Sequence, residues 1–236
     1  MESIPFYIGI LFTAVALITV WFLYKAAGSS LLPVIIITAW AVVQSILAMN
    51  SFYRDNTTIP PRIALLLVPM LMITVVILVR AKQFIGNLDL KWLTLLHTVR
   101  LPVEIGLFLL YTEKLVPGLM TFEGGNLDIL SGITAPFVYY FTFVKPRMSF
   151  RFLLLWNFLC LFLLINILIR AILSVPTPIQ QLAFEQPNTG ILYFPVILLP
   201  AVIVPLVLLS QLAAIKRLWK KENGFSRFEI TAGGKQ

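Results

Sequence analysis

The chain is dominated by apolar stretches that are each long enough to cross a lipid bilayer. A spanning α-helix needs about 20 predominantly apolar residues. Seven such stretches are present, over residues 5–24, 31–50, 61–79, 92–111, 127–144, 152–173 and 190–215. Because an open strand cannot satisfy its backbone hydrogen bonds in lipid, we expect all seven to be helices.

Composition excludes the soluble and the disulfide-stabilised classes of protein. Hydrophobic residues make up 59% of the 236 residues and charged residues only 12%, whereas a soluble domain has about 45–50% and about 25%. The single cysteine, Cys160, has no partner for a disulfide within the chain. We therefore predict an all-α, polytopic membrane bundle, with a seven-helix transmembrane domain over residues 1–215 and a basic tail over residues 216–236.

Lysine and arginine residues fall mainly on one side of the predicted spans. With an outer N-terminus, the inner segments hold Lys25, Arg80, Lys82, Lys91, Lys145, Arg147, Arg151, Lys216, Arg217, Lys220, Lys221, Arg227 and Lys235. The outer segments hold Arg54, Arg62, Lys114 and Arg170. Because cytoplasmic loops carry an excess of basic residues, this bias predicts an N-terminus outside and a C-terminus in the cytoplasm. We expect the protein to reside in the bacterial cytoplasmic (inner) membrane.

The net charge of +8 follows from this topology rather than from a nucleic-acid interface. The basic residues are dispersed over short loops and one tail, so we expect no nucleic-acid partner. The tail segment from Lys216 to Lys221 favours anionic lipid headgroups at the cytoplasmic face, at about 1 kcal/mol per basic residue. The lipid bilayer is thus the first expected partner, and a second membrane protein is an alternative.

The fourth stretch holds ionisable residues deep inside an apolar sequence. His97, the only histidine of the chain, is followed by Arg100 and Glu104. On a helix these three side chains lie within an arc of about 60°, and the four-residue spacing lets Arg100 and Glu104 pair. A charge at the bilayer centre costs about 2.5–3.5 kcal/mol. We therefore expect the stripe to face the bundle interior or a wet cavity.

Two interpretations of this polar stripe stay open. The functional one makes it a proton relay or an anion-sensitive gate, because intramembrane ionisable residues are functional candidates by default. The structural one makes Arg100 and Glu104 a buried ion pair, with His97 hydrogen-bonded to another helix. Catalysis on a lipid would need an acid–base pair, which only His97 and Glu104 supply.

Two outer connections form a second candidate site, of unknown metal content. Its residues are Glu123, Asn126, Asp128, Arg170 and Glu185. Carboxylate and amide oxygens suit a cation or a polar ligand. The structural alternative is that Asn126 or Asp128 caps the fifth helix, while Arg170 snorkels or pairs with one of the acids.

The chain lacks the motifs of several large enzyme classes. One histidine and one cysteine exclude a Cys/His zinc set and an HExxH metalloprotease helix. The sequence contains no P-loop, no dinucleotide fingerprint and no GxSxG elbow, so we expect no cofactor. The in-span amides are expected to face inward and link helices; they are Gln44, Asn157, Asn166 and Gln211.

These patterns lead to a prediction of function without a substrate. We expect a multipass membrane protein that moves or senses a small solute or a proton through the bundle, centred on His97, Arg100 and Glu104. One alternative is a non-catalytic membrane subunit or assembly partner of a larger complex. A second alternative is an intramembrane lipid-modifying enzyme.

Overall fold

The computed structural model describes residues 4–55 and 58–233, with side chains as far as residue 221. Within these ranges all regular structure is helical and no strand is present, which confirms the predicted all-α class. The α-helices are α1 (Phe6–Ala26), α2 (Leu31–Met49), α3 (Ala64–Arg80), α4 (Lys82–Asn87), α5 (Leu90–Leu96), α6 (Arg100–Thr112), α7 (Ile129–Tyr139), α8 (Phe150–Leu173) and α9 (Val204–Gly233).

Tighter and wider helical turns join these helices. The 3-10 turns are η1 (Phe52–Arg54), η2 (His97–Val99), η3 (Gly118–Met120), η4 (Phe122–Gly124) and η6 (Gly190–Leu192). The π-helical turns are η5 (Tyr140–Val144), which extends α7, and η7 (Leu199–Ile203), which leads into α9. Such turns satisfy backbone groups where a regular α-helix is interrupted.

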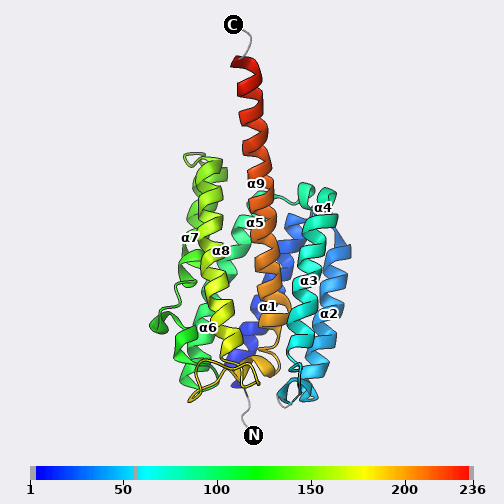
Figure 1. Ribbon diagram of the computed structural model, residues 1–236, viewed down its shortest axis with the longest axis vertical. Coiled ribbons are helices and arrows are strands. Elements are labelled where there is room, and N and C mark those ends of the chain that lie inside the picture. Colours follow the sequence, from blue (N-terminus) through cyan, green and yellow to red (C-terminus); the bar gives the residue numbers. More distant parts are fainter. Residues whose placement is uncertain (1–3, 56–57, 234–236) are drawn as a thin grey trace.

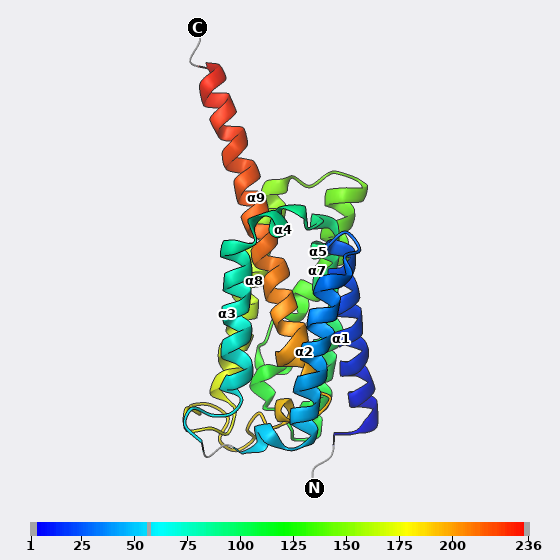
Figure 2. The ribbon, with the colours of Figure 1, turned by 90° about the vertical axis from the view of Figure 1, so that its right-hand side faces the viewer.

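The long helices form a bundle with a common long axis. The start of α1 and the end of α9 lie at opposite ends of the bundle, and α9 projects beyond the other helices (Figure 1). The view turned by 90° shows the same arrangement, with α1 and α2 beside each other (Figure 2). A chain that starts and finishes at opposite ends fits an odd number of passes.

Five helical segments of the described chain are long and apolar enough to cross a membrane. They are Phe6–Ala26, Leu31–Met49, Leu90–Thr112, Phe150–Leu173 and Leu199–Lys221. The other two predicted spans form the shorter apolar helices Ala64–Arg80 and Ile129–Val144. The first of these has 17 residues, a rise of about 26 Å against a hydrocarbon core of about 30 Å. The apolar helices agree with membrane integration, while the count of seven stays a prediction.

Prolines shape the last predicted span. The sequence predicts that this helix begins at residue 190. In the structure residues Gly190–Leu192 form a 3-10 turn, and the long helix begins only at Leu199. The physical reason is that prolines at 195 and 200 supply no N–H to a helical ladder. Pro205 likewise leaves the carbonyl of Ala201 without a helical donor, and Trp40 Nε1 donates to that carbonyl at 3.1 Å. A side chain of α2 thus satisfies a backbone group that proline freed.

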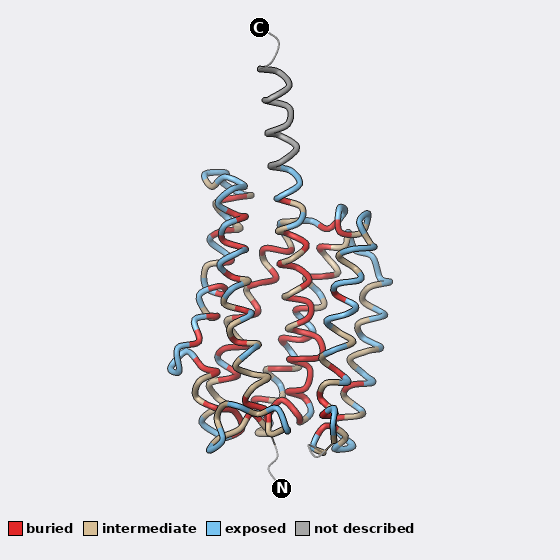
Figure 3. The backbone as a smooth tube through the Cα atoms, viewed as in Figure 1, coloured by how far each residue is buried: buried red, intermediate tan, exposed pale blue. Residues whose placement is uncertain are grey.

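The core of the bundle is formed by α9 and by the α5–α6 segment. Buried positions cluster along these central elements, whereas α2 and α3 are largely exposed at the periphery (Figure 3). The predicted inward orientation of the in-span amides is confirmed for Gln44, Asn157 and Gln211, which are buried, while Asn166 is half-buried. Helix α9 is continuous across residues 215 and 216, so the division into bundle and tail stays a prediction. Residues 234–236 of that tail lie outside the described residues.

We predict that cysteines introduced at Gln83 and Gln181 react from opposite sides of the membrane. Seven passes place these exposed positions on different sides, because three passes separate them. If the short helices α3 and α7 do not cross, the two positions share a side. Labelling of Gln83→Cys and Gln181→Cys with a membrane-impermeant maleimide, in intact and in opened cells, decides between these topologies. Wild-type protein is the control, since its Cys160 is buried.

Candidate functional site

Arg100 is the centre of a buried polar cluster. Its Nε donates to Asp128 Oδ2 at 2.8 Å, and its Nη2 donates to Asp128 Oδ1 and, at 3.0 Å, to the carbonyl oxygen of Cys160. Both members of the pair are buried. The structure thus pairs Arg100 with Asp128 rather than with Glu104. Asp128 accepts two hydrogen bonds from the guanidinium, and this bidentate geometry is stronger and more specific than a single contact.

Glu104 lies beside this ion pair and has a different partner. Asn126 Nδ2 donates to Glu104 Oε1 at 2.7 Å and to the carbonyl of Met120 at 3.0 Å. Asn126 Oδ1 accepts from the backbone N–H of Asp128 at 3.1 Å. Asn126 therefore holds the loop before α7 against α6. We call Arg100, Glu104, Asn126 and Asp128 the polar cluster.

A proline positions Arg100 at the start of α6. Pro102 has no N–H, so the carbonyl of Thr98 loses its usual helical donor. The chain tightens into the 3-10 turn His97–Val99 between α5 and α6. Arg100 follows directly, on the side of α6 that faces the interior of the bundle, where its guanidinium meets α7 and α8.

A glycine positions Asp128 opposite Arg100. A Cβ atom at Gly132, one turn into α7, would lie 2.5 Å from the backbone nitrogen of Leu101. That contact is impossible for any residue other than glycine unless the backbone moves. The missing side chain lets α7 approach α6 closely enough for Asp128, the residue before α7, to reach the guanidinium.

His97 is buried but stands apart from the hydrogen bonds of the polar cluster. Its ring packs edge-on against Trp156, with the ring centroids 5.5 Å apart. Trp156 Nε1 in turn donates to Thr134 Oγ1 at 3.0 Å. Neither ring nitrogen of His97 has a hydrogen-bond partner within the described part of the chain. The predicted hydrogen bond from His97 to another helix is therefore absent there.

The predicted outer-face site divides into two parts. Asn126 and Asp128 turn inward to the polar cluster, whereas Glu123 and Glu185 are exposed. Arg170 Nη1 donates to the carbonyls of Leu119 and Gly124, both at 3.0 Å, and so braces the turn between α6 and α7. No group of three or more His, Cys, Asp or Glu side chains suited to a metal occurs among the residues the structure describes.

The capping role expected of Asp128 is wrong. Asp128 occupies the N-cap position of α7, but its side chain makes no capping hydrogen bond. Both carboxylate oxygens accept from Arg100 instead. A charge-assisted pair in an apolar surround is stronger than a single cap bond, so the carboxylate points toward the guanidinium.

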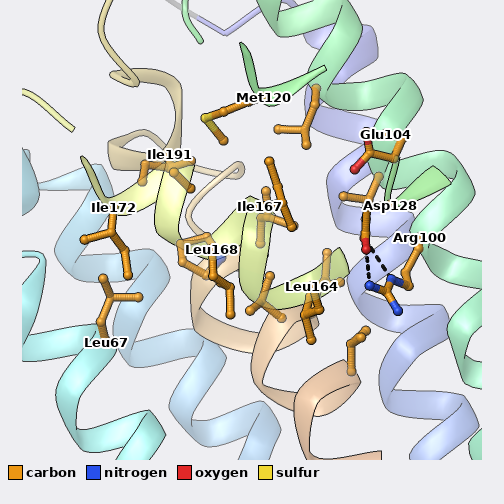
Figure 4. A pocket seen from close by; sticks show the side chains of 18 of the residues that line it. Leu67, Arg100, Glu104, Met120, Asp128, Leu164, Ile167, Leu168, Ile172 and Ile191 are labelled. Carbon is orange, nitrogen blue, oxygen red and sulfur yellow. Dashed lines mark hydrogen bonds and ion pairs between the residues drawn. The ribbon is translucent and has the colours of Figure 1, made fainter. Parts of the chain in front are cut away.

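A cavity of about 80 Å³ extends from the polar cluster toward α3. Figure 4 shows Arg100, Glu104 and Asp128 together on one side of it, with Leu67 and Ile172 on the opposite side. Between them the walls are apolar; they include Leu164, Ile167 and Leu168 of α8 and Leu199, Pro200 and Ile203 of η7. A volume of this size holds several water-sized groups.

The two ends of the cavity differ in exposure and in chemistry. Leu67 of α3 and Ile172 of α8 are partly exposed, whereas Arg100 and Glu104 are buried. Arg100 Nη1 and Glu104 Oε2 have no hydrogen-bond partner among the described residues. The cavity therefore leads from the apolar side of the bundle to two buried residues, one with an unpaired donor and one with an unpaired acceptor. Such atoms are costly to bury unless a further group binds them.

Sequence reasoning missed the role of Asp128 because it placed the residue at the outer surface. The fifth predicted span is short, and Asp128 stands at its first turn. A short helix begins below the membrane surface, which brings its first residues to the depth of an in-span arginine. The length of that span was the available signal.

A family model matches most of the chain. The model of the domain of unknown function DUF8737 matches residues 62–219, which is more than half of the chain. The chain belongs to the DUF8737 family. No curated protein and no solved structure matches it. The DUF8737 segment contains the whole polar cluster and the cavity, whereas α1 and α2 precede it.

We predict that Asp128→Leu lowers the free energy of unfolding by about 3–5 kcal/mol, because it leaves the Arg100 guanidinium buried without its anion. The double variant Arg100→Met/Asp128→Leu removes both charges and recovers most of this loss. Denaturant titration of the purified protein in detergent measures both. Glu123→Gln, at an exposed acid of the same loop, is the control and leaves stability unchanged. A double variant as unstable as Asp128→Leu contradicts the assignment.

We predict that Gly132→Ala separates α7 from α6 and destabilises the protein by roughly 1–3 kcal/mol, as overpacking does. The matched control is Gly86→Ala in α4, where a Cβ meets nothing within 4 Å. Alanine is the better helix former, so this control is neutral or slightly stabilising. Thermal unfolding of the two variants, side by side, tests the close approach; equal melting temperatures would refute it.

Proposed function

We propose that this DUF8737 protein is an integral membrane protein that takes up a small amphipathic solute from the bilayer and moves or senses it through the bundle. The observation that carries the proposal is the cavity with apolar walls and a single polar end. Ligand sites in proteins have this composition, in which apolar walls supply affinity and a few polar groups fix orientation.

The proposed topology has seven passes, with the N-terminus outside and the C-terminus in the cytoplasm of a bacterial cell. It is supported by the opposite positions of the start of α1 and the end of α9 (Figure 1). The bias of basic residues supports its direction. In this topology the cavity entrance between α3 and α8 faces the acyl chains, so a solute enters sideways from lipid.

The unpaired atoms at the polar end indicate what the solute carries. Arg100 Nη1 is a hydrogen-bond donor and Glu104 Oε2 is an acceptor, and neither has a partner among the described residues. A hydroxyl group matches both atoms, because it accepts a hydrogen bond from Arg100 Nη1 and donates one to Glu104 Oε2. A carboxylate only accepts, so it would leave Glu104 Oε2 without a donor, and an ammonium only donates, so it would leave Arg100 Nη1 without an acceptor. The best match is therefore an uncharged amphiphile with a hydroxyl group.

The remaining residues of the polar cluster position these two groups. Asp128 binds Nε and Nη2 of Arg100, so the third guanidinium nitrogen, Nη1, is directed away from the carboxylate. Asn126 occupies Glu104 Oε1, which leaves Oε2 for the solute. His97 is absent from the described residues that line the cavity, so solute binding is better supported than a proton relay through His97. The subunit and lipid-enzyme alternatives have no separate support in the described chain.

A photoreactive alcohol tests this function. The purified protein is illuminated with a diazirine derivative of 1-octanol, and the labelled residues are mapped by mass spectrometry. We expect label on cavity residues of α8 and η7, competed by unlabelled octanol. Glu104→Gln exchanges the charged acceptor for an amide, and we expect labelling to fall about tenfold, the effect of losing one hydrogen bond to a charged group.

Two matched variants make the experiment decisive. Glu123→Gln carries the same change at an exposed site and keeps wild-type labelling. Leu168→Trp fills the cavity with a larger side chain and removes labelling whatever the polar contacts. Monodisperse elution shows that each variant is folded. Wild-type labelling of Glu104→Gln would refute the proposed role of the cluster.

A further inference from the structure

A second cavity, of about 570 Å³, lies at the end of the bundle from which α9 projects. Along the chain, its residues between α4 and α5 are separated from the polar cluster by the rest of α5 and by η2, and the lining residues come from three parts of the chain. They are Asn87, Leu88, Asp89, Leu90 and Lys91 between α4 and α5, Phe143 and Phe150 around the turn between α7 and α8, and Arg217 and Lys221 of α9. Figure 2 shows α4 and α5 near α9 at this end.

The described lining of this cavity is positively charged. Lys91, Arg217 and Lys221 face a single carboxylate, Asp89. Asp89 Oδ1 already accepts from the backbone N–H of Lys91 at 2.8 Å, as the cap of α5. The carboxylate also interacts electrostatically with Arg217, but three cations against one carboxylate leave the cavity with an excess of positive charge.

One of these cations presents a buried donor without a partner. The Nη1 of Arg217 is inaccessible to solvent and makes no hydrogen bond within the described residues. Lys221 Nζ lies 3.7 Å from the centre of the Phe150 ring, a cation–π contact that keeps the ammonium at the rim of the cavity. A guanidinium with a free donor beside an ammonium matches an anion that accepts several hydrogen bonds.

We propose that this cavity binds a phosphate group, with Arg217 and Lys221 as its principal ligands. A phosphate has enough acceptor oxygens to engage both side chains, and its charge matches the excess on the cavity walls. The aromatic rings of Phe143 and Phe150 add an apolar side to the same cavity. A phospholipid headgroup joins these two chemistries in one molecule, because its phosphate is attached to glycerol and acyl chains.

The place of the cavity in the fold favours a lipid as the source of the phosphate. It lies where the apolar helices end and the basic residues of α9 begin, which is the level of the headgroups for a bundle embedded in a bilayer. Anionic lipids gather at basic segments that leave the membrane, and a shaped cavity adds selectivity to that attraction. A free phosphate has the same acceptors and is the other source.

Lipid titration with native mass spectrometry tests the proposal on the full-length protein. Phosphatidylglycerol is titrated against purified protein in detergent, with phosphatidylcholine as the zwitterionic reference. We expect Arg217→Gln and Lys221→Gln each to weaken phosphatidylglycerol binding about tenfold, the loss expected for one charge-assisted hydrogen bond. Lys220→Gln is the matched control: it removes the same charge from the neighbouring exposed position, outside the described lining, and keeps wild-type binding.

A second arm uses inorganic phosphate with delipidated protein and measures binding by calorimetry. If only phosphatidylglycerol binding depends on Arg217 and Lys221, the site is a lipid site. If inorganic phosphate binding shows that dependence, the phosphate assignment holds and its source is soluble. If Lys221→Gln and Lys220→Gln behave alike toward both ligands, the proposal is overturned. Lys221 is exposed, so this comparison stands even if Arg217→Gln fails to fold.

Discussion

The bidentate ion pair between Arg100 and Asp128 is the constraint on which the interior of this bundle depends. A guanidinium enclosed by apolar helices is tolerated only with an anion and further acceptors around it. Meeting that demand requires the start of α7 to lie against α6, which only a glycine at 132 permits. It also turns the preceding loop inward, so Asn126 reaches Glu104. The geometry of the whole polar cluster follows from one arginine in an apolar sequence.

Not every polar atom of the cluster has a hydrogen-bond partner among the described residues, which distinguishes the cluster from a purely structural ion pair. Asp128 and Cys160 occupy Nε and Nη2 of Arg100, and Asn126 occupies one oxygen of Glu104. The two remaining atoms have no partner in the described chain, and the residues that carry them line a cavity with apolar walls. In a low-dielectric interior an unpaired polar atom is costly, and a hydrogen bond to it is correspondingly strong. The same physics supports the proposal that this site binds a small amphiphile.

Two prolines inside the helices show how backbone groups are satisfied without water. Pro102 and Pro205 each remove a helical donor. Near Pro102 the chain tightens into a 3-10 turn, and at Pro205 the indole of Trp40 donates to the freed carbonyl. These interruptions leave irregular backbone at the centre, in η2 and η7, where it borders the polar cluster or the cavity. Irregular backbone inside apolar surroundings is tolerated where protein encloses it or where it lines a cavity.

The sequence by itself determined the class of the protein, the approximate helices and the three ionisable residues of the fourth span, because apolar length and the cost of a buried charge are local properties. It did not determine the partner of Arg100. Helical spacing offered Glu104, whereas the tertiary structure supplied Asp128 from the start of α7, 28 positions further along the chain. The outer-face candidates were divided for the same reason, since a carboxylate is exposed or buried according to which helix packs against it.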